Sequence, residues 1–288
     1  MKNLIVYYES ILDEPDFNQA AKDIEIHNIL SKIFDFSGRY NNHYNPHTKT
    51  LEFDELKVIT CDRKGIPSFV IYHDYRQEYI PVKDLTDLGI KLECISRSIF
   101  IDPWTIKKGF KLSDLNMTKC TGVLDLGNNR RLFGSHKTAL TPQDLNKFIN
   151  CSVKDFNSIS VDNPKLISAA SLSKFKKVIL DFSYVKTKDI IVSDIKHCSN
   201  EKLYIPYYSD DVISGNVFYE LKHFITMCNT HKDYYESDKN YKAYEQMKNV
   251  VKQNPGTEIY IAPGGYEFTR IDIDMNDNLV YDDQISYM

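Results

Sequence analysis

Long apolar runs are absent from this 288-residue sequence: no segment approaches the ~18 consecutive apolar residues of a membrane-spanning helix. The opening apolar residues 4–6 are interrupted at once by polar ones, far short of the core of a signal peptide. The six cysteines are scattered, without the close Cys-x-x-Cys pairs that mark many zinc sites. We therefore expect a cytoplasmic protein with reduced thiols and no use for a membrane.

The sequence also lacks the signatures of common active sites. No GxxxxGK[ST], GxSxG or HExxH segment occurs, which excludes the usual motifs of P-loop enzymes, α/β-hydrolases and zinc proteases. The formal net charge of −4 gives no general attraction for nucleic acid. These absences favour a non-enzymatic role and disfavour a nucleic-acid partner.

Glycine and proline are few, at 11 and 10 residues, whereas tyrosine and phenylalanine are many, at 20 and 15. Apolar residues make up 42% of the chain and charged residues 26%, which is ordinary for a globular protein. Aromatic side chains enlarge hydrophobic cores and also form binding surfaces. The composition thus predicts a folded chain without deciding what its aromatic residues do.

One short pattern recurs through the middle of the chain: two apolar residues separated by a single position. It starts at residues 99, 124, 159, 178 and 203, at intervals of 25, 35, 19 and 25 residues. Shorter amphipathic stretches stand between these phrases, and an alternation of strand and helix predicts a parallel sheet. We predict neighbouring parallel strands on which the second apolar residue of each phrase is buried: Ile101, Leu126, Val161, Leu180 and Ile205.

The repeated phrases over residues 95–213 resemble degenerate leucine-rich repeats, whose period is roughly 20–29 residues. That family has an Asn three residues after the second apolar position, and only one position here matches: the residues are Trp104, Asn129, Pro164, Ser183 and Tyr208. The resemblance implies a short strand-helix solenoid that exposes an extended surface to another protein. The alternative is an ordinary α/β or α+β domain with evenly spaced strands.

We predict an α/β chain in three parts. Residues 1–94 would hold an N-terminal helix that runs until Ser37 and Gly38, a polar loop at 39–50, and a small β-rich region. Residues 95–214 would form the repeat-like α/β region. Residues 215–288 would form a helical pair followed by β-hairpins around the turns at 263–265 and 276–278.

The segment from Tyr8 to Asp13 is similar to a short N-terminal signature of uncharacterised proteins of tailed phages that infect gut bacteria. This resemblance implies a phage-encoded or phage-derived protein and specifies no activity. The function that we expect is protein binding or scaffolding. The alternatives are a phage-borne nuclease or transferase, whose site is assembled from distant residues, and a structural part of a virion.

Five residues are candidates for binding. Trp104, Tyr207 and Tyr208 follow the first and last phrases, where an aromatic side chain either faces a partner or packs a loosened repeat. Arg130 and Arg131, like Lys107 and Lys108, follow a strand phrase and would contact an anion or an acidic partner, or would simply be solvated.

We expect no metal and no other cofactor. His43 and His47 stand in the polar loop without a second ligand pair, and His223, Cys228 and His231 do not share one helix face. The series Asp272, Asp274, Asn276 and Asp283 nearly spells a calcium loop, but Asp277 replaces its turn glycine. For this segment we instead predict a hairpin with acidic residues on its solvated side.

Overall fold

The structure is a computed structural model of the whole chain. It describes residues 17–73, 76–127, 139–150, 156–163, 166, 169–180, 200–206, 217–230, 239–262 and 267–287. In the first part of the chain the elements are α2 (Phe17–Ile33), β1 (His43–Asn45), β2 (Thr50–Phe53), β3 (Lys57–Cys61), β4 (Pro67–His73), β5 (Arg76–Pro81), α3 (Val82–Asp87) and β6 (Lys91–Cys94).

The middle part of the chain begins with β7 (Ser98–Ile101) and continues with α4 (Pro103–Lys107), the 3₁₀ helix η1 (Leu112–Leu115), β8 (Met117–Asp125), α6 (Pro142–Phe148), β9 (Phe156–Val161), the 3₁₀ helix η3 (Ala170–Lys174), β10 (Phe175–Leu180) and β11 (Lys202–Pro206). The last part holds α7 (Val217–Thr230), α9 (Lys239–Gln253), β12 (Glu258–Ala262), β13 (Glu267–Ile273) and β14 (Leu279–Tyr287). The fold is mixed α/β, as predicted.

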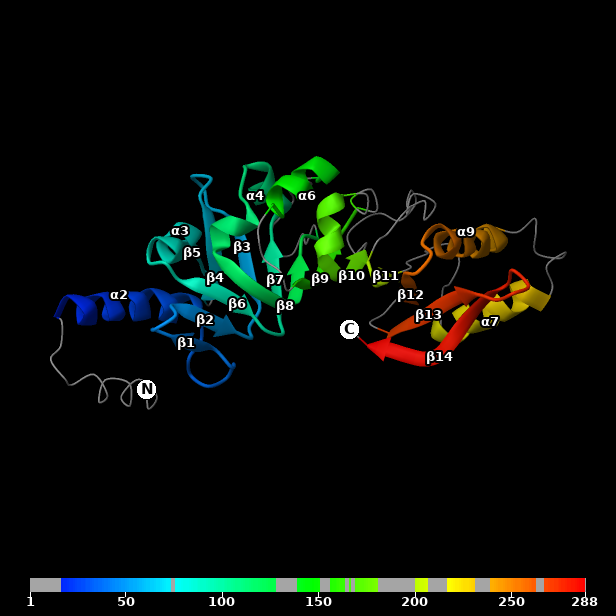
Figure 1. Cartoon of the computed structure of the whole chain (residues 1–288), viewed down its shortest axis with the longest axis horizontal. Helices are drawn as coiled ribbons and strands as arrows, with labels where there is room; N and C mark the ends of the chain where they lie inside the picture. The colour runs from blue at the N-terminus through cyan, green and yellow to red at the C-terminus, as the bar shows by residue number, and fades with distance from the viewer. Residues whose placement is uncertain are drawn as a thin grey trace.

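All of these strands belong to one 14-stranded, mostly parallel sheet, whose main path is β14-β13-β12-β11-β10-β9-β8-β7-β3-β4-β5. The branch β1-β2-β6 joins this path through β8. From β7 to β12 each strand lies parallel beside the next strand of the chain. Figure 1 shows the strands following one another along the longest axis of the molecule.

The five apolar phrases form a register across this parallel part. Ile99 is the partner of Leu124, and the row continues through Ile159, Val178 and Leu203 to Ile259. Ile101, Val161, Leu180 and Ile205 lie on their strands, Leu126 directly follows β8, and all five are at most 1% exposed. The prediction of buried residues on neighbouring parallel strands is confirmed.

The described helices pack on a single face of the sheet. Each of them contributes buried side chains to the main hydrophobic cluster, together with the first and last residues of every phrase. Connections between parallel strands are right-handed. When each connection leads to the next strand in the same direction along the sheet, the connecting helices all lie on the same side of it. In Figure 1, α4 and α6 lie together on one side of the strands.

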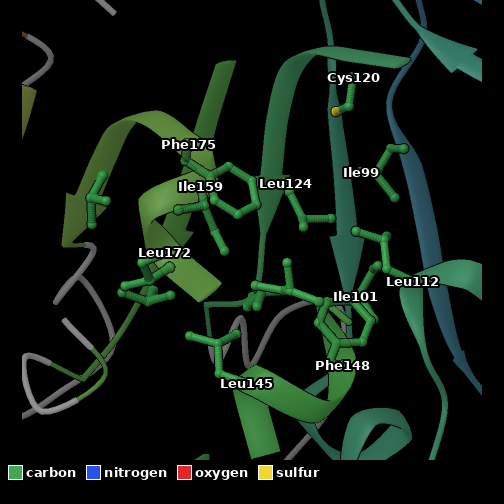
Figure 2. Packing of buried hydrophobic residues seen from close by; sticks show 14 of the residues in the cluster. Ile99, Ile101, Leu112, Cys120, Leu124, Leu145, Phe148, Ile159, Leu172 and Phe175 are labelled. Carbon is green, nitrogen blue, oxygen red and sulfur yellow. The ribbon is translucent and has the colours of Figure 1, made fainter. Parts of the chain in front are cut away.

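Close packing holds this helical layer against the sheet. Figure 2 shows Leu145 and Phe148 of α6 and Leu172 of η3 near the strand residues Ile101 and Ile159. Phe148 is fully buried and its ring centroid lies 6.3 Å from that of Phe110. Thr141 caps α6 and Pro142 is its first residue, with Thr141 and Asp144 forming a reciprocal capping box.

The structure corrects the prediction for residues 39–50 and adds detail to the prediction for the C-terminal hairpin. The segment 39–50 was expected to be a loop, but β1 lies within it and pairs antiparallel with β2, so that prediction is wrong for residues 43–45. Such short edge strands carry too few residues for a visible period. At the other end, β13 and β14 pair antiparallel around residues 274–278 and extend the sheet beyond β12.

Gly122 allows β8 to change partners. Its first half pairs with β6 and its second half with β7, and the register shifts between Cys120 and Val123. A Cβ atom at Gly122 would stand 1.9 Å from the backbone oxygen of Arg97. Only glycine therefore fits where the backbone between β6 and β7 crosses this strand.

We predict that Gly122→Ala destabilises the protein by about 1–3 kcal/mol or more, because backbone atoms must move to admit the methyl group. Urea denaturation measures the change. Gly127→Ala is the matched control: its Cβ would meet the side-chain oxygen of Asp125 at 3.0 Å, a contact that can yield by side-chain rotation. Equal stability of the two variants would show that β6, β7 and β8 do not converge in this way.

Candidate binding surface

Trp104 is the one predicted binding residue that lies within the described part of the chain. It stands in the first turn of α4, where Asp102 accepts a hydrogen bond from the Trp104 backbone nitrogen at 2.9 Å. Asp102 therefore caps the N-terminus of α4. Tyr207, Tyr208, Arg130 and Arg131 lie outside the described residues.

The Trp104 side chain is 41% exposed, and the ammonium group of Lys108 lies 4.5 Å from its ring centroid. It is therefore not a core residue. We predict that Trp104→Ala lowers the free energy of unfolding by less than about 1 kcal/mol, as expected for a surface residue with one cation–π contact. A thermal melt checks this, and a loss above about 2 kcal/mol would assign Trp104 to packing.

Lys107 is engaged inside the chain and does not form a free basic pair with Lys108. Its ammonium lies 2.5 Å from the Asp144 carboxylate of α6. Burial opposes ionisation of Asp144, but hydrogen bonds from Lys107 and Thr141 lower the pKa of that carboxyl to about 2. Lys107 thus links α4 to α6, and the expected anion contact is left to Lys108 alone among these two residues.

The middle residue of each phrase points away from the helices, because side chains alternate across a strand. These residues and their neighbours form the helix-free face, the side of the sheet on which none of the described helices packs. Its central row runs across the sheet through Val58, Phe100, Asp125, Ser160, Ile179, Tyr204, Tyr260 and Arg270.

Two tyrosines stack on this face. Tyr204 of β11 and Tyr260 of β12 are register partners, and their rings lie 4.7 Å apart at an angle of 10°. Ile179 and Val123 pack against them. Tyr204 is only 3% exposed, whereas Tyr260 is half-buried and presents part of its side chain to solvent.

Charged side chains frame the stacked rings. The Tyr260 hydroxyl donates to Glu258 Oε2 at 2.9 Å, and Lys202 Nζ lies 3.1 Å from the same oxygen. Arg270 Nη1 lies 3.5 Å from Glu258 Oε1. The side chains of Lys202, Glu258 and Arg270 are 34%, 35% and 39% exposed, so a partner could reach all three. We call Lys202, Tyr204, Glu258, Tyr260 and Arg270 the tyrosine patch.

The electrostatics of the tyrosine patch suit recognition better than proton transfer. The hydrogen bond to Glu258 raises the pKa of Lys202, and hydrogen bonds from Lys202 and Tyr260 lower the pKa of Glu258. Burial raises the pKa of the Tyr260 hydroxyl, and its bond to Glu258 acts in the same direction. At neutral pH these groups stay as ammonium, carboxylate and phenol, none poised as a general acid or base.

A second apolar cluster lies on the helix-free face toward the other end of the sheet. It consists of Val58, Val70, Tyr79 and Phe100, on β3, β4, β5 and β7. Tyr72 of β4 is 50% exposed on the same strand as Val70. Ser158 and Ser160 of β9, both small, separate this cluster from the tyrosine patch along the sheet.

Across the described ranges, no three His, Cys, Asp or Glu side chains gather as a metal site would require. Cys228 is buried at 2% exposure whereas His223 is exposed, and His231 lies outside the described residues. The calcium-like series forms the β13–β14 turn: Asp274 accepts backbone hydrogen bonds from Asn276 and Asn278, and Asp277 pairs with Lys248 and Lys252.

Tyr204 and Tyr260 were not singled out from the sequence. The available signal was the middle position of each phrase, which alternation places on the opposite side from the core. In the phrase Leu203-Tyr204-Ile205 that position is aromatic, and Ile259-Tyr260-Ile261 repeats the pattern after the helical pair. The apolar positions of the phrases do not reveal these aromatic middle residues.

Comparisons with protein-family models, curated proteins and solved structures return no match. No helix in the described part of the chain has the length and apolar character needed to cross a membrane. Any inference about function must therefore rest on the residues at the surface of the structure.

Proposed function

We propose that this chain is a non-enzymatic protein-binding or scaffolding module that recognises its partner through the tyrosine patch on the helix-free face. The observation that carries the proposal is the stacked pair Tyr204–Tyr260, framed by partly exposed charges, on a side of the sheet that no described helix covers. Tyrosine and arginine are enriched among residues that dominate binding energy.

The strand order suits an extended binding surface. Between β7 and β12 every strand lies beside the next strand of the chain, and the order changes direction only at β3, beside β7. Strands that advance in one direction under a one-sided helical layer also suit a short degenerate solenoid, an architecture that offers an extended surface to a partner.

Affinity purification with matched variants tests the proposal. Tagged wild-type protein, Tyr260→Ser, Arg270→Glu, Trp104→Ala and Lys83→Glu are compared in one cell extract by quantitative mass spectrometry. Lys83 is 77% exposed on α3, on the helical side, so Lys83→Glu controls for a charge reversal. We expect a partner that Tyr260→Ser and Arg270→Glu lose and that both other variants retain.

Retention of every partner by the two patch variants, after melting curves confirm that they fold, would contradict the proposal. Loss on Trp104→Ala alone would move the binding surface to the carboxyl ends of the strands, where α4 begins. A phage origin stays a prediction that rests on Tyr8–Asp13 alone.

A further inference from the structure

Lys202 of the tyrosine patch faces a second lysine, Lys177, on the neighbouring strand. Lys177 of β10 and Lys202 of β11 are direct register partners, so their side chains leave the same side of the sheet. Like charges directly opposite each other on neighbouring strands destabilise a sheet. Such a pair is tolerated where counter-charges neutralise both members or where the site serves another purpose.

Only one of these lysines is neutralised within the described part of the chain. Lys202 pairs with Glu258 at 3.1 Å, whereas Lys177 has no ion pair with any described residue. Its register partner on the other side is Ser158, which carries no charge. Lys177 is half-buried, and it stands two residues before Ile179, on the same side of β10.

Among the described residues, the positive charge without an ion pair in this region is local to Lys177. Lys202 pairs with Glu258, and Arg270 pairs with Glu258 and with Asp272, which lies 3.5 Å from Arg270 Nη2. Asp125 of β8 lies on the same face, so the positive excess is confined to the Lys177–Lys202 pair. A local excess of positive charge beside stacked aromatic rings complements a ligand with both acidic and apolar groups.

We propose that the tyrosine patch binds an acidic, extended segment of a partner protein, with a partner carboxylate at Lys177 and an apolar side chain against Tyr260. This inference rests on the proposed function and adds the chemistry of the partner. A carboxylate between Lys177 and Lys202 relieves their repulsion and forms charge-assisted hydrogen bonds. A protein segment is favoured over nucleic acid because it can place one carboxylate at Lys177 and an apolar side chain at Tyr260, whereas a uniform polyanion would also meet Glu258 and Asp272.

Fluorescence anisotropy with labelled probes tests the proposal on the full chain. The probes are four: peptides of about ten residues, extended to about 33 Å, in which Leu and Tyr alternate with Asp/Glu, with Ser/Gln or with Lys, and a deoxythymidine oligonucleotide of about ten nucleotides. We expect the acidic peptide to bind most tightly, and Lys177→Gln to weaken it by about tenfold, the loss of one charge-assisted contact.

Lys176→Gln is the matched control, because Lys176 is the exposed neighbour on β10 whose side chain alternates to the other side. It should leave the affinity unchanged. The melting temperature gives an independent readout: Lys177→Gln removes one of two opposed like charges, so it should leave the melting temperature unchanged or raise it. A clear decrease would make Lys177 a structural residue and overturn the proposal.

The remaining outcomes separate the two proposals. Equal binding of the neutral peptide, lost on Tyr260→Ser and kept on Lys177→Gln, would overturn the acidic chemistry and leave the tyrosine patch as a binding surface. Tighter binding of the oligonucleotide would overturn it in favour of nucleic acid. Binding of no peptide would also overturn it, while the affinity purification would still decide the proposed function.

Discussion

Lys57→Met is expected to lower the free energy of unfolding by about 3–5 kcal/mol, the range for breaking a buried ion pair from one side. Lys57 and Glu55 are each 7% exposed, and their charged groups lie 3.0 Å apart. The Lys57 ammonium also donates to the backbone oxygen of Ile33, the last residue of α2, and lies 4.7 Å from the Phe34 ring centroid.

The cost arises because the partner carboxylate stays buried. Glu55 Oε1 accepts hydrogen bonds from the Asp35 backbone nitrogen at 2.9 Å and from Asn42 Nδ2 at 2.7 Å, contacts that hold it in place when Lys57 is removed. Burial lowers the pKa of Lys57, with the Glu55 charge acting against that shift. The pair therefore depends on mutual neutralisation.

Chemical denaturation measures this effect, and two variants control for it. Lys83→Met removes an exposed lysine, 3.9 Å from Asp87, and should change stability by no more than about 0.5 kcal/mol. The double variant Lys57→Met/Glu55→Gln should recover part of the loss because no buried charge is left alone. If Lys57→Met is as stable as Lys83→Met, the described packing at the end of α2 is wrong.

Leu180→Ala is expected to destabilise by about 2–5 kcal/mol, as other truncations of buried leucines do. Leu180 is fully buried in the main cluster, at the end of β10, and its register partner on β9 is Val161. Removing its side chain opens a cavity between the sheet and the helical layer. Urea denaturation measures the loss.

Leu180→Met is the matched variant, because it keeps the volume and should cost less than about 1.5 kcal/mol. A midpoint for Leu180→Ala within error of wild type would place Leu180 outside the core. It would also remove the register on which the order of the five strands depends.

The order of the parallel strands could be predicted because the signal is local and repeated. Each phrase contributes two core residues to one strand, and the amphipathic stretches between phrases favour a sequential parallel arrangement. The long helices were also accessible: the first was expected to run until Ser37 and Gly38, whereas α2 ends at Ile33, and the helical pair lies where the helical period is clear.

The rest depends on contacts between distant residues. The Glu55–Lys57 pair is completed by Ile33, Asp35 and Asn42, which a single sequence does not connect. The sequence gives Gly122 no special role, because its close approach to the Arg97 backbone oxygen arises only in the fold. Tyr204 and Tyr260 are separated in the sequence by the whole helical pair. The sequence pattern marks each tyrosine separately, and only the fold brings the two rings together.

Site-specific photo-crosslinking tests the central claim, recognition on the helix-free face, most directly. The photoreactive residue p-benzoylphenylalanine is placed in turn at position 260 and at position 104, each replacing a partly exposed aromatic residue on a different part of the surface. The account predicts a discrete crosslinked partner from position 260 and none from position 104. A partner crosslinked from position 104 and absent from position 260 would contradict it.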